Sequence, residues 1–250
     1  MEPSEHASGV PSAVSARSAI LTLMLASDES VFPDRDILAV TRAVGVSEPT
    51  ARVALSRMAA AGDVSREGGG PYSLSDRLQE RRRLQRQRID PVVTSWNGEW
   101  ELAVVTRTGR SATQRAALRE QLTLLRLGEL REGVWMRPAN LEMPWPPAVA
   151  EEVRRLRAEP IEDAADLARS LWDLDRWSAR GHSLLRAIAS AGDPTARFAA
   201  CVASVRHLMT DPTLPDQLRP EDWPAAELRA SYREYRTWLF SLGSAANERA

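Results

Sequence analysis

The sequence predicts an α+β protein with several domains. Its 250 residues exceed the ~100 to 150 of a common single domain, so two or three domains are expected. Hydrophobic residues make up 43% of the chain and charged residues 27%, which is typical of globular proteins. Strand and helix patterns alternate in the first part of the chain, whereas the later patterns are helical. We expect tails at 1–12 and 243–250, and domains at 13–90, 91–159 and 160–242.

The first domain begins with three short helices. Apolar residues recur at helical spacing across 15–26. Pro33 suits the first turn of a second helix and Gly45 its end, while Ser47 is a favourable N-cap for a third helix that ends near Gly62. Two short helices joined by a glycine-containing turn are typical of a helix-turn-helix.

Two short strands then flank a glycine-rich tip. They lie at 63–66 and 72–74, around Glu67-Gly68-Gly69-Gly70-Pro71. An arginine-rich helix follows from 75 to 90 and is too polar for a core, so we expect it to be a connector. These features predict an N-terminal winged helix-turn-helix domain.

The middle domain is predicted to be ferredoxin-like. It has a strand at 101–106, a helix at 111–127, a hairpin at 129–136 and a returning strand at 151–158. The helix is expected to end at Gly128 and to bury Ala116, Leu118, Leu122 and Leu125. A helical C-terminal domain is predicted from helices at 164–172, 174–190, 194–209 and 225–242.

The charge pattern places any DNA contact in the first domain. The net charge of −1 excludes a globally cationic nucleic-acid binder. Residues 35–88 nevertheless hold eleven arginines against six acids, whereas residues 148–250 hold fourteen against sixteen. Positive charge is therefore concentrated toward the N-terminal domain.

The third helix has a polar face suited to DNA. A helical wheel puts Ala51, Ala54, Leu55 and Met58 on the core side. Short and guanidinium side chains that can approach phosphates or guanine lie opposite: Thr50, Arg52, Val53, Ser56 and Arg57.

Each of these candidates has a structural alternative. Arg57 can instead pair with an acid such as Asp63, in a solvated helix. Arg66 in the wing either reaches a minor groove or is an ordinary surface arginine. The run Arg81-Arg82-Arg83 is favoured to be a solvated helix face.

Catalytic and metal motifs are missing from the sequence. There is no GxSxG, P-loop or HExxH, and the three histidines are scattered, so no enzyme activity, cofactor or metal is expected. The single cysteine, Cys201, fits a reducing cytoplasm, and no apolar run is long enough for a signal peptide or a membrane span.

Tryptophans and arginines suggest a small-molecule site. Tryptophan is frequent after residue 95, and a subset can wall a pocket at the boundary of the second and third domains. The alternative is that they are core residues and that the nearby arginines are exposed. The candidate effector-binding residues are Trp135, Arg169, Trp172, Arg176 and Arg180.

The chain resembles the PaaX family of transcription repressors over residues 15 to 240. The resemblance is carried, in order, by TARVALSRMAAAGDVSRE, WNGEWELAVV, LREQLTLLRLGELREGVWMRP, LWDLDRW and DPTLPDQLRPEDWP. It implies a middle domain similar to the CRISPR adaptation nuclease, phenylacetyl-coenzyme A as the effector of the name-giving members, and a DNA-reading role for Arg52, Ser56 and Arg57. Two departures are Arg126, in a region where the family often has glycine, and Arg107, in place of the nuclease's metal-binding aspartate.

We therefore expect a cytoplasmic homodimer that represses a catabolic operon. It would bind double-stranded, palindromic operator DNA and release it when a small effector binds, such as an aryl-acetyl-coenzyme A. The alternatives are a metal-dependent nuclease built on the middle domain and a ligand-binding protein without DNA recognition.

Overall fold

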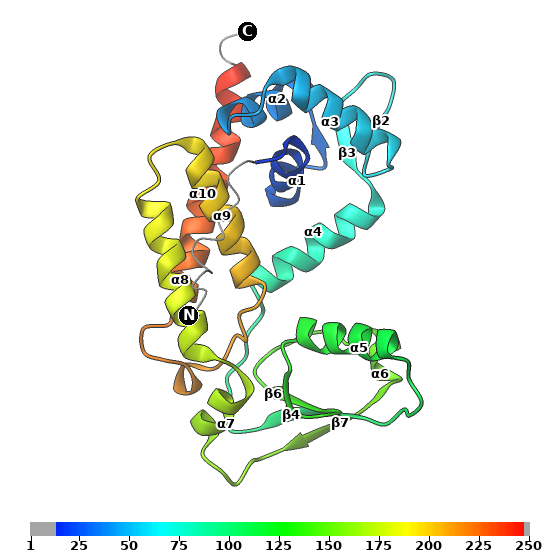
Figure 1. Cartoon of the computed structure of the whole chain (residues 1–250), viewed down its shortest axis with the longest axis vertical. Coiled ribbons are helices and arrows are strands. Elements are labelled where there is room, and N and C mark those ends of the chain that lie inside the picture. Colours follow the sequence, from blue (N-terminus) through cyan, green and yellow to red (C-terminus); the bar gives the residue numbers. More distant parts are fainter. Residues whose placement is uncertain (1–13, 248–250) are drawn as a thin grey trace, which may run out of the picture. The chain divides into compact units, whose positions relative to one another are not determined.

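A computed structural model describes residues 14 to 247, and the side chains of residues 14 to 241 (Figure 1). The tail predicted at 1–12 lies outside the described residues. The fold is mixed α+β, with two antiparallel sheets. The described residues form two compact units: the first holds 14–89, 182–207 and 226–247, and the second holds 90–181 and 208–225. None of the described helices combines the length and the apolar character needed to span a bilayer.

The first unit begins with three helices and a small sheet. The helices are α1 (Ala16–Ala26), α2 (Asp34–Ala43) and α3 (Glu48–Ala60). The antiparallel sheet has the order β1-β3-β2, formed by β1 (Val31–Phe32), β2 (Val64–Arg66) and β3 (Tyr72–Leu74). Helix α4 (Asp76–Ile89) follows the sheet.

The predicted helix boundaries in this unit are confirmed by their caps. The Ser47 hydroxyl accepts a hydrogen bond from the amide of Thr50 and so caps α3. Gly45 ends the preceding turn at φ +83°, a left-handed conformation that glycine adopts without strain. Strand β1 was not predicted, because two residues are too few to show an alternating pattern.

The C-terminal helices share the core of the first unit. Helices α8 (Leu174–Ala189), α9 (Pro194–Leu208) and α10 (Ala225–Asn247) end the chain, and α10 makes residues 243–247 of the predicted tail helical. One core cluster includes α1 together with Phe198, Cys201, Tyr235 and Leu239. Helix α1 is buried on most sides because helices from both ends of the chain surround it.

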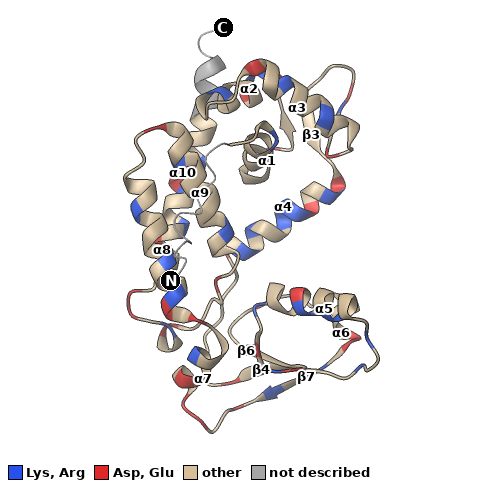
Figure 2. Ribbon diagram, viewed as in Figure 1, with Lys and Arg blue, Asp and Glu red and all other residues tan. Residues whose placement is uncertain are grey.

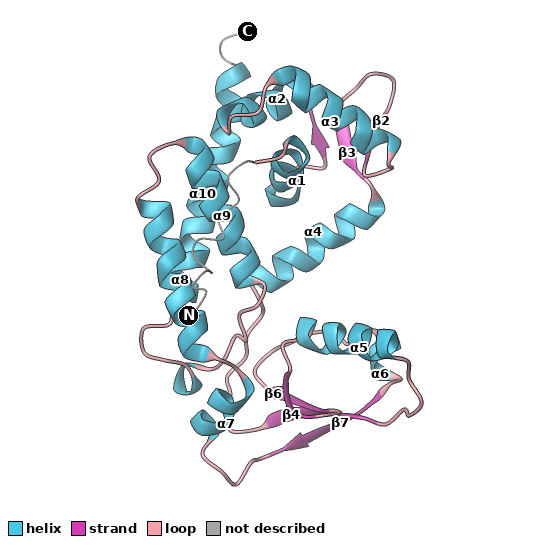
Figure 3. Ribbon diagram, viewed as in Figure 1, coloured by secondary structure: helices cyan, strands magenta, loops and turns pink. Residues whose placement is uncertain are grey.

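The second unit is a four-stranded antiparallel sheet with the order β5-β6-β4-β7 (Figure 3). Its strands are β4 (Trp100–Val105), β5 (Gly128–Arg131), β6 (Val134–Pro138) and β7 (Val153–Ala158). Its helices are α5 (Ala112–Leu124), α6 (Pro147–Ala150) and α7 (Ala164–Leu171), and a 3-10 turn η1 spans Asp216–Leu218.

Helix α5 packs on the sheet through Leu122, with Leu118 at the edge of the contact, as predicted. Ala116, however, is exposed, because only the last turns of α5 reach the core. The helix also stops before Gly128. The chain turns instead at Arg126, whose φ is +63°. Glycine adopts this left-handed conformation without strain, which explains why glycine would be favourable at position 126.

Gly128 has a different role from the predicted helix stop. It begins β5 and packs against α7, where a Cβ atom would lie 2.8 Å from that of Leu171 and 3.1 Å from the Trp172 ring. A side chain would therefore push α7 away from the sheet.

The second unit buries an ion pair. The Arg137 side chain donates to Glu101 Oε2 at 2.8 Å and to the Leu125 carbonyl at 2.8 Å, and Arg137 is 1% exposed. Arg155 donates to the other oxygen of Glu101 at 2.5 Å. Burial alone would raise the pKa of Glu101, but the charge and hydrogen bonds of Arg137 and Arg155 outweigh it and hold that pKa below its ordinary value.

Candidate nucleic-acid interface

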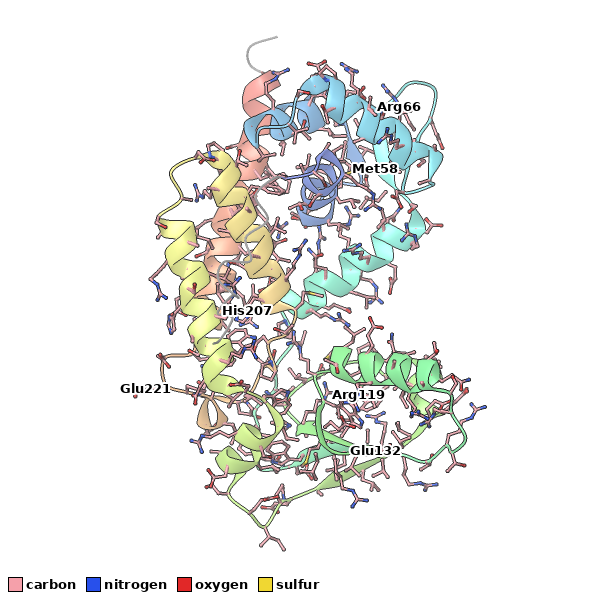
Figure 4. All side chains as sticks on the ribbon, in the orientation of Figure 1. Met58, Arg66, Arg119, Glu132, His207 and Glu221 are labelled. Carbon is pink, nitrogen blue, oxygen red and sulfur yellow. The ribbon has the colours of Figure 1, made fainter. Side chains whose placement is uncertain are left out.

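Helix α3 presents a continuous exposed face. Ala51, Leu55 and Met58 are buried on its core side, as predicted. Met58 is labelled in Figure 4. The five predicted contact residues are all exposed on the other side: Thr50, Arg52, Val53, Ser56 and Arg57. The structure thus brings these residues together on one surface that no other described segment covers.

Arg52 is held by acidic neighbours. Its Nε and a terminal nitrogen donate to Glu48 Oε1 at 3.0 and 2.8 Å, and Asp34 lies 3.8 Å away. The hydrogen bond and charge of Arg52 lower the pKa of Glu48. Any DNA contact by Arg52 must therefore compete with an existing intramolecular pair.

Arg57 differs from Arg52 in this respect. It is exposed, and no carboxylate within the described part of the chain forms an ion pair with it. Its predicted alternative partner, Asp63, is instead bound by Arg17 at 2.7 Å and by Arg77 at 2.5 Å. The guanidinium of Arg57 is the cation on this face that a phosphate or a guanine can take without breaking an internal contact.

Asp63 joins α3 to the hairpin. Its amide donates to the Met58 carbonyl at the end of α3, its own carbonyl accepts from Ser75, and its buried carboxylate binds Arg17 and Arg77. These contacts fix the direction in which the chain leaves the helix. Sequence reasoning assigned Asp63 only as a possible partner of Arg57.

We expect Asp63→Asn to lower the free energy of unfolding by about 1 to 2 kcal/mol, because two charge-assisted hydrogen bonds become weaker but both arginines are largely exposed. Thermal denaturation followed by circular dichroism measures the change. Arg57→Ala is the matched control and should melt like the unmodified protein. An unaltered melting curve for Asp63→Asn would contradict the structural role.

Arg66 fastens the hairpin to α2. It donates to the carbonyls of Gly69 and Gly70, both at 2.7 Å, pairs with Asp34 at 3.0 Å, and lies over the Tyr72 ring at 4.9 Å (labelled in Figure 4). The sequence offered a minor-groove contact or a plain surface position. These contacts cover about two thirds of the Arg66 side chain.

Arginines recur along α4, as the blue segments of Figure 2 show, and two of them contact another segment of the chain. Arg82 and Arg86 donate to backbone carbonyls in the loop that follows α1, Arg82 to Glu29 at 2.5 Å and Arg86 to Ser27, and Arg86 also pairs with Asp28 at 2.7 Å. Arg83 follows the surface pattern, since it pairs with Glu80 three residues away, and Arg81 is exposed as well. These contacts to the loop after α1 were not foreseen from the sequence.

The candidate effector residues are only partly gathered. Arg169 and Trp172 line a shallow hollow of about 260 Å³ between α7 and η1, and Arg169 pairs with Asp166. Trp135 lies in the core beneath α5, with Arg119 over its ring at 5.4 Å. Arg176 and Arg180 are exposed on α8, outside the lining of that hollow.

The described residues contain no group of three or more histidine, cysteine or acidic side chains arranged to hold a metal. At the end of β4, Arg107 forms an ion pair with Glu152 at 2.7 Å, and Arg110 binds the same carboxylate at 2.7 Å. Glu152 is thus occupied by two guanidinium groups. This local chemistry does not suit a divalent cation.

Comparisons with known proteins cover nearly the whole chain. Residues 15–78 match a family model described as a PaaX-like protein, 93–170 a PaaX protein central Cas2-like domain, and 172–248 a PaaX-like protein C-terminal domain. The chain is 44% identical to the uncharacterised protein Rv0674 from Mycobacterium tuberculosis, with a TM-score of 0.84 over 93% of this chain and 99% of that one. No protein with a curated description matches it.

Proposed function

Because the chain belongs to the PaaX family, we propose that it is a transcriptional repressor that binds operator DNA through a winged helix-turn-helix. Helices α2 and α3 form the helix-turn-helix, β2 and β3 form the wing, and α4 is the connector. The observation that carries the proposal is the exposed face of α3, where Arg57 has no internal ion pair in the described structure. Thr50, Val53 and Ser56 beside it are small enough to let the helix enter a major groove.

The wing supports the helix in this proposal. Arg66 holds the glycine tip against α2, so the hairpin keeps one shape when DNA approaches. The middle domain is proposed to be ferredoxin-like, a topology that the strand order β5-β6-β4-β7 supports. We also propose that the domains divide at residues 90 and 159 and that the protein is cytoplasmic.

The repressor is proposed to act as a two-fold symmetric homodimer. One helix offers few base contacts, and a palindromic operator doubles them, with half-sites about one helical turn or a multiple apart. Light scattering of the protein on operator DNA gives the stoichiometry. A complex that contains a single chain would contradict the dimer.

DNA binding is tested by a gel shift with the upstream region of the chain's own gene. The proposal expects a sequence-specific complex that forms in EDTA and survives excess unrelated DNA. Cleavage of DNA or RNA that requires magnesium would favour a nuclease instead. The absence of any specific complex would leave a ligand-binding protein without DNA recognition.

Release of the operator is proposed to follow binding of an acyl-coenzyme A, such as an aryl-acetyl-coenzyme A of a catabolic pathway. Arg169 and Trp172 supply a cation and an apolar surface for it, with Trp135, Arg176 and Arg180 as further candidates. A coupling of ~1 to 3 kcal/mol would weaken DNA binding about 5- to 150-fold. Titration of acyl-coenzyme A compounds and free acids into the protein–operator complex tests this proposal. Release of the DNA by free acids alone would contradict a thioester effector.

A further inference from the structure

The first unit contains a cavity of about 270 Å³ that the proposed function does not use. Its lining residues come from four helices, α1, α4, α9 and α10, which are labelled in Figure 1. Its apolar lining includes Leu21, Leu25, Val202 and Val205. The volume lies just below the ~300 to 1,000 Å³ of ordinary ligand pockets, so it suits a small molecule.

The charged groups of this cavity are all positive. Arg17, Arg81 and Arg206 line it from three different helices, and its lining includes no aspartate or glutamate. Arg17 is paired with Asp63, whereas Arg81 and Arg206 are exposed and form no ion pair with the described residues. Three guanidinium groups around one apolar space favour an anion.

Tyr235 and Cys201 keep the wall of this cavity free of negative charge. Both residues line it and both are buried. Burial raises the pKa of Tyr235 and raises that of Cys201 to about 12. Both groups therefore stay neutral near pH 7, and neither opposes an anion in the cavity.

We propose that this cavity binds a small organic anion, a carboxylate or phosphate carried on an apolar body. Arg81 and Arg206 hold the anionic group, and the leucine and valine side chains cover the apolar part of the ligand. This site shares no lining residue with the hollow at Arg169 and Trp172.

The cavity is also connected to the DNA-facing helix. Arg17 lines the cavity and at the same time binds Asp63, whose amide is hydrogen-bonded to the last turns of α3. An anion in the cavity competes with Asp63 for Arg17, which loosens the joint between α3 and the hairpin. This regulatory step rests on the proposed function, whereas binding of the anion does not.

Isothermal titration calorimetry of the full chain tests the binding. The probes are 3-phenylpropionate against its neutral amide, and phenyl phosphate against phenol, which separates carboxylate from phosphate ligands. We expect at least one anion to bind about tenfold or more tightly than its neutral partner, as charge-assisted hydrogen bonds require.

Variants then locate the site. Arg81→Ala and Arg206→Ala should each remove the preference for the anion, because each takes away one guanidinium group from the cavity. Arg83→Ala is the matched control, because Arg83 lies on the same helix but pairs with Glu80 outside the cavity. Equal binding of charged and neutral probes, no binding by any probe, or full anion binding in both arginine variants would overturn the proposal.

A separate measurement addresses the regulatory step. The binding anion is added to the protein on operator DNA, with Arg81→Ala as the variant that should no longer respond. If the protein binds no DNA at all, the proposed function fails while the calorimetry still decides the site. If the anion binds the protein but leaves the operator complex unchanged, the link through Arg17 and Asp63 is wrong.

Discussion

Arg57→Ala is expected to weaken operator binding about 5- to 150-fold, because a base or phosphate contact contributes ~1 to 3 kcal/mol. The structure separates this effect from a loss of stability. Arg57 is exposed and forms no ion pair with the described residues, so its removal leaves no buried group without a partner. Fluorescence anisotropy with labelled operator measures the affinity, and circular dichroism checks that the fold is intact.

Arg52→Ala provides the internal comparison. Arg52 already binds Glu48 and lies near Asp34, so a contact between Arg52 and DNA requires breaking its ion pair with Glu48. Removal of the Arg52 side chain leaves both carboxylates without this counter-charge, close to the DNA phosphates. Arg83→Ala, on α4, should leave the affinity unchanged. If Arg57→Ala binds the operator as tightly as Arg83→Ala does, Arg57 makes no contact and the proposed orientation of α3 on DNA is wrong.

Glu101→Ala is expected to destabilise the second unit by about 3 to 5 kcal/mol, since it leaves the buried Arg137 without its counter-charge. Urea denaturation followed by tryptophan fluorescence is the appropriate measurement, because seven of the eight tryptophans lie in this unit. The double variant Glu101→Leu with Arg137→Met should recover much of the loss, because no buried charge remains. A small effect of Glu101→Ala would contradict the buried pair.

The same pair predicts a pH dependence. Because the pKa of Glu101 is lowered in the folded protein, the carboxylate contributes stability that is fully present above its ordinary pKa of 4.5 and is lost as the pH falls through the folded value. The denaturation midpoint should therefore decline with acidification below about pH 4.5, and Glu101→Gln should flatten that decline. If the unmodified protein and Glu101→Gln lose stability identically as the pH falls, Glu101 does not cause that loss.

Local signals in the sequence predicted most of the first unit. Ser47, Gly45 and the glycine-rich tip after Arg66 act within a few residues, so they placed the helices and the hairpin correctly. The amphipathic pattern of α3 likewise predicted its exposed face, since helical periodicity depends only on neighbouring turns.

The remainder depended on contacts between distant residues. Strand β1 exists because it pairs with β3, forty residues later, and Asp63 is bound by Arg17 and Arg77 from other helices. Trp135 lies in the core under α5, the alternative that the sequence left open, because α5 and the sheet pack together there. Likewise, no sequence pattern joins Arg17, Arg81, Arg206 and Tyr235, which meet only when four helices pack.

A DNA-cleaving probe attached to α3 tests most directly whether this helix reads the operator. Cys201 is buried and burial raises its thiol pKa to about 12, so a cysteine introduced by Ser56→Cys is the reactive one to carry an iron chelate. Ser190→Cys, exposed at the end of α8, is the control. We expect cleavage from position 56 at two symmetric places on the operator, about one helical turn or a multiple apart, and little cleavage from position 190. Equal cleavage from both positions, or none from position 56 on bound operator, would contradict the claim that α3 reads the DNA.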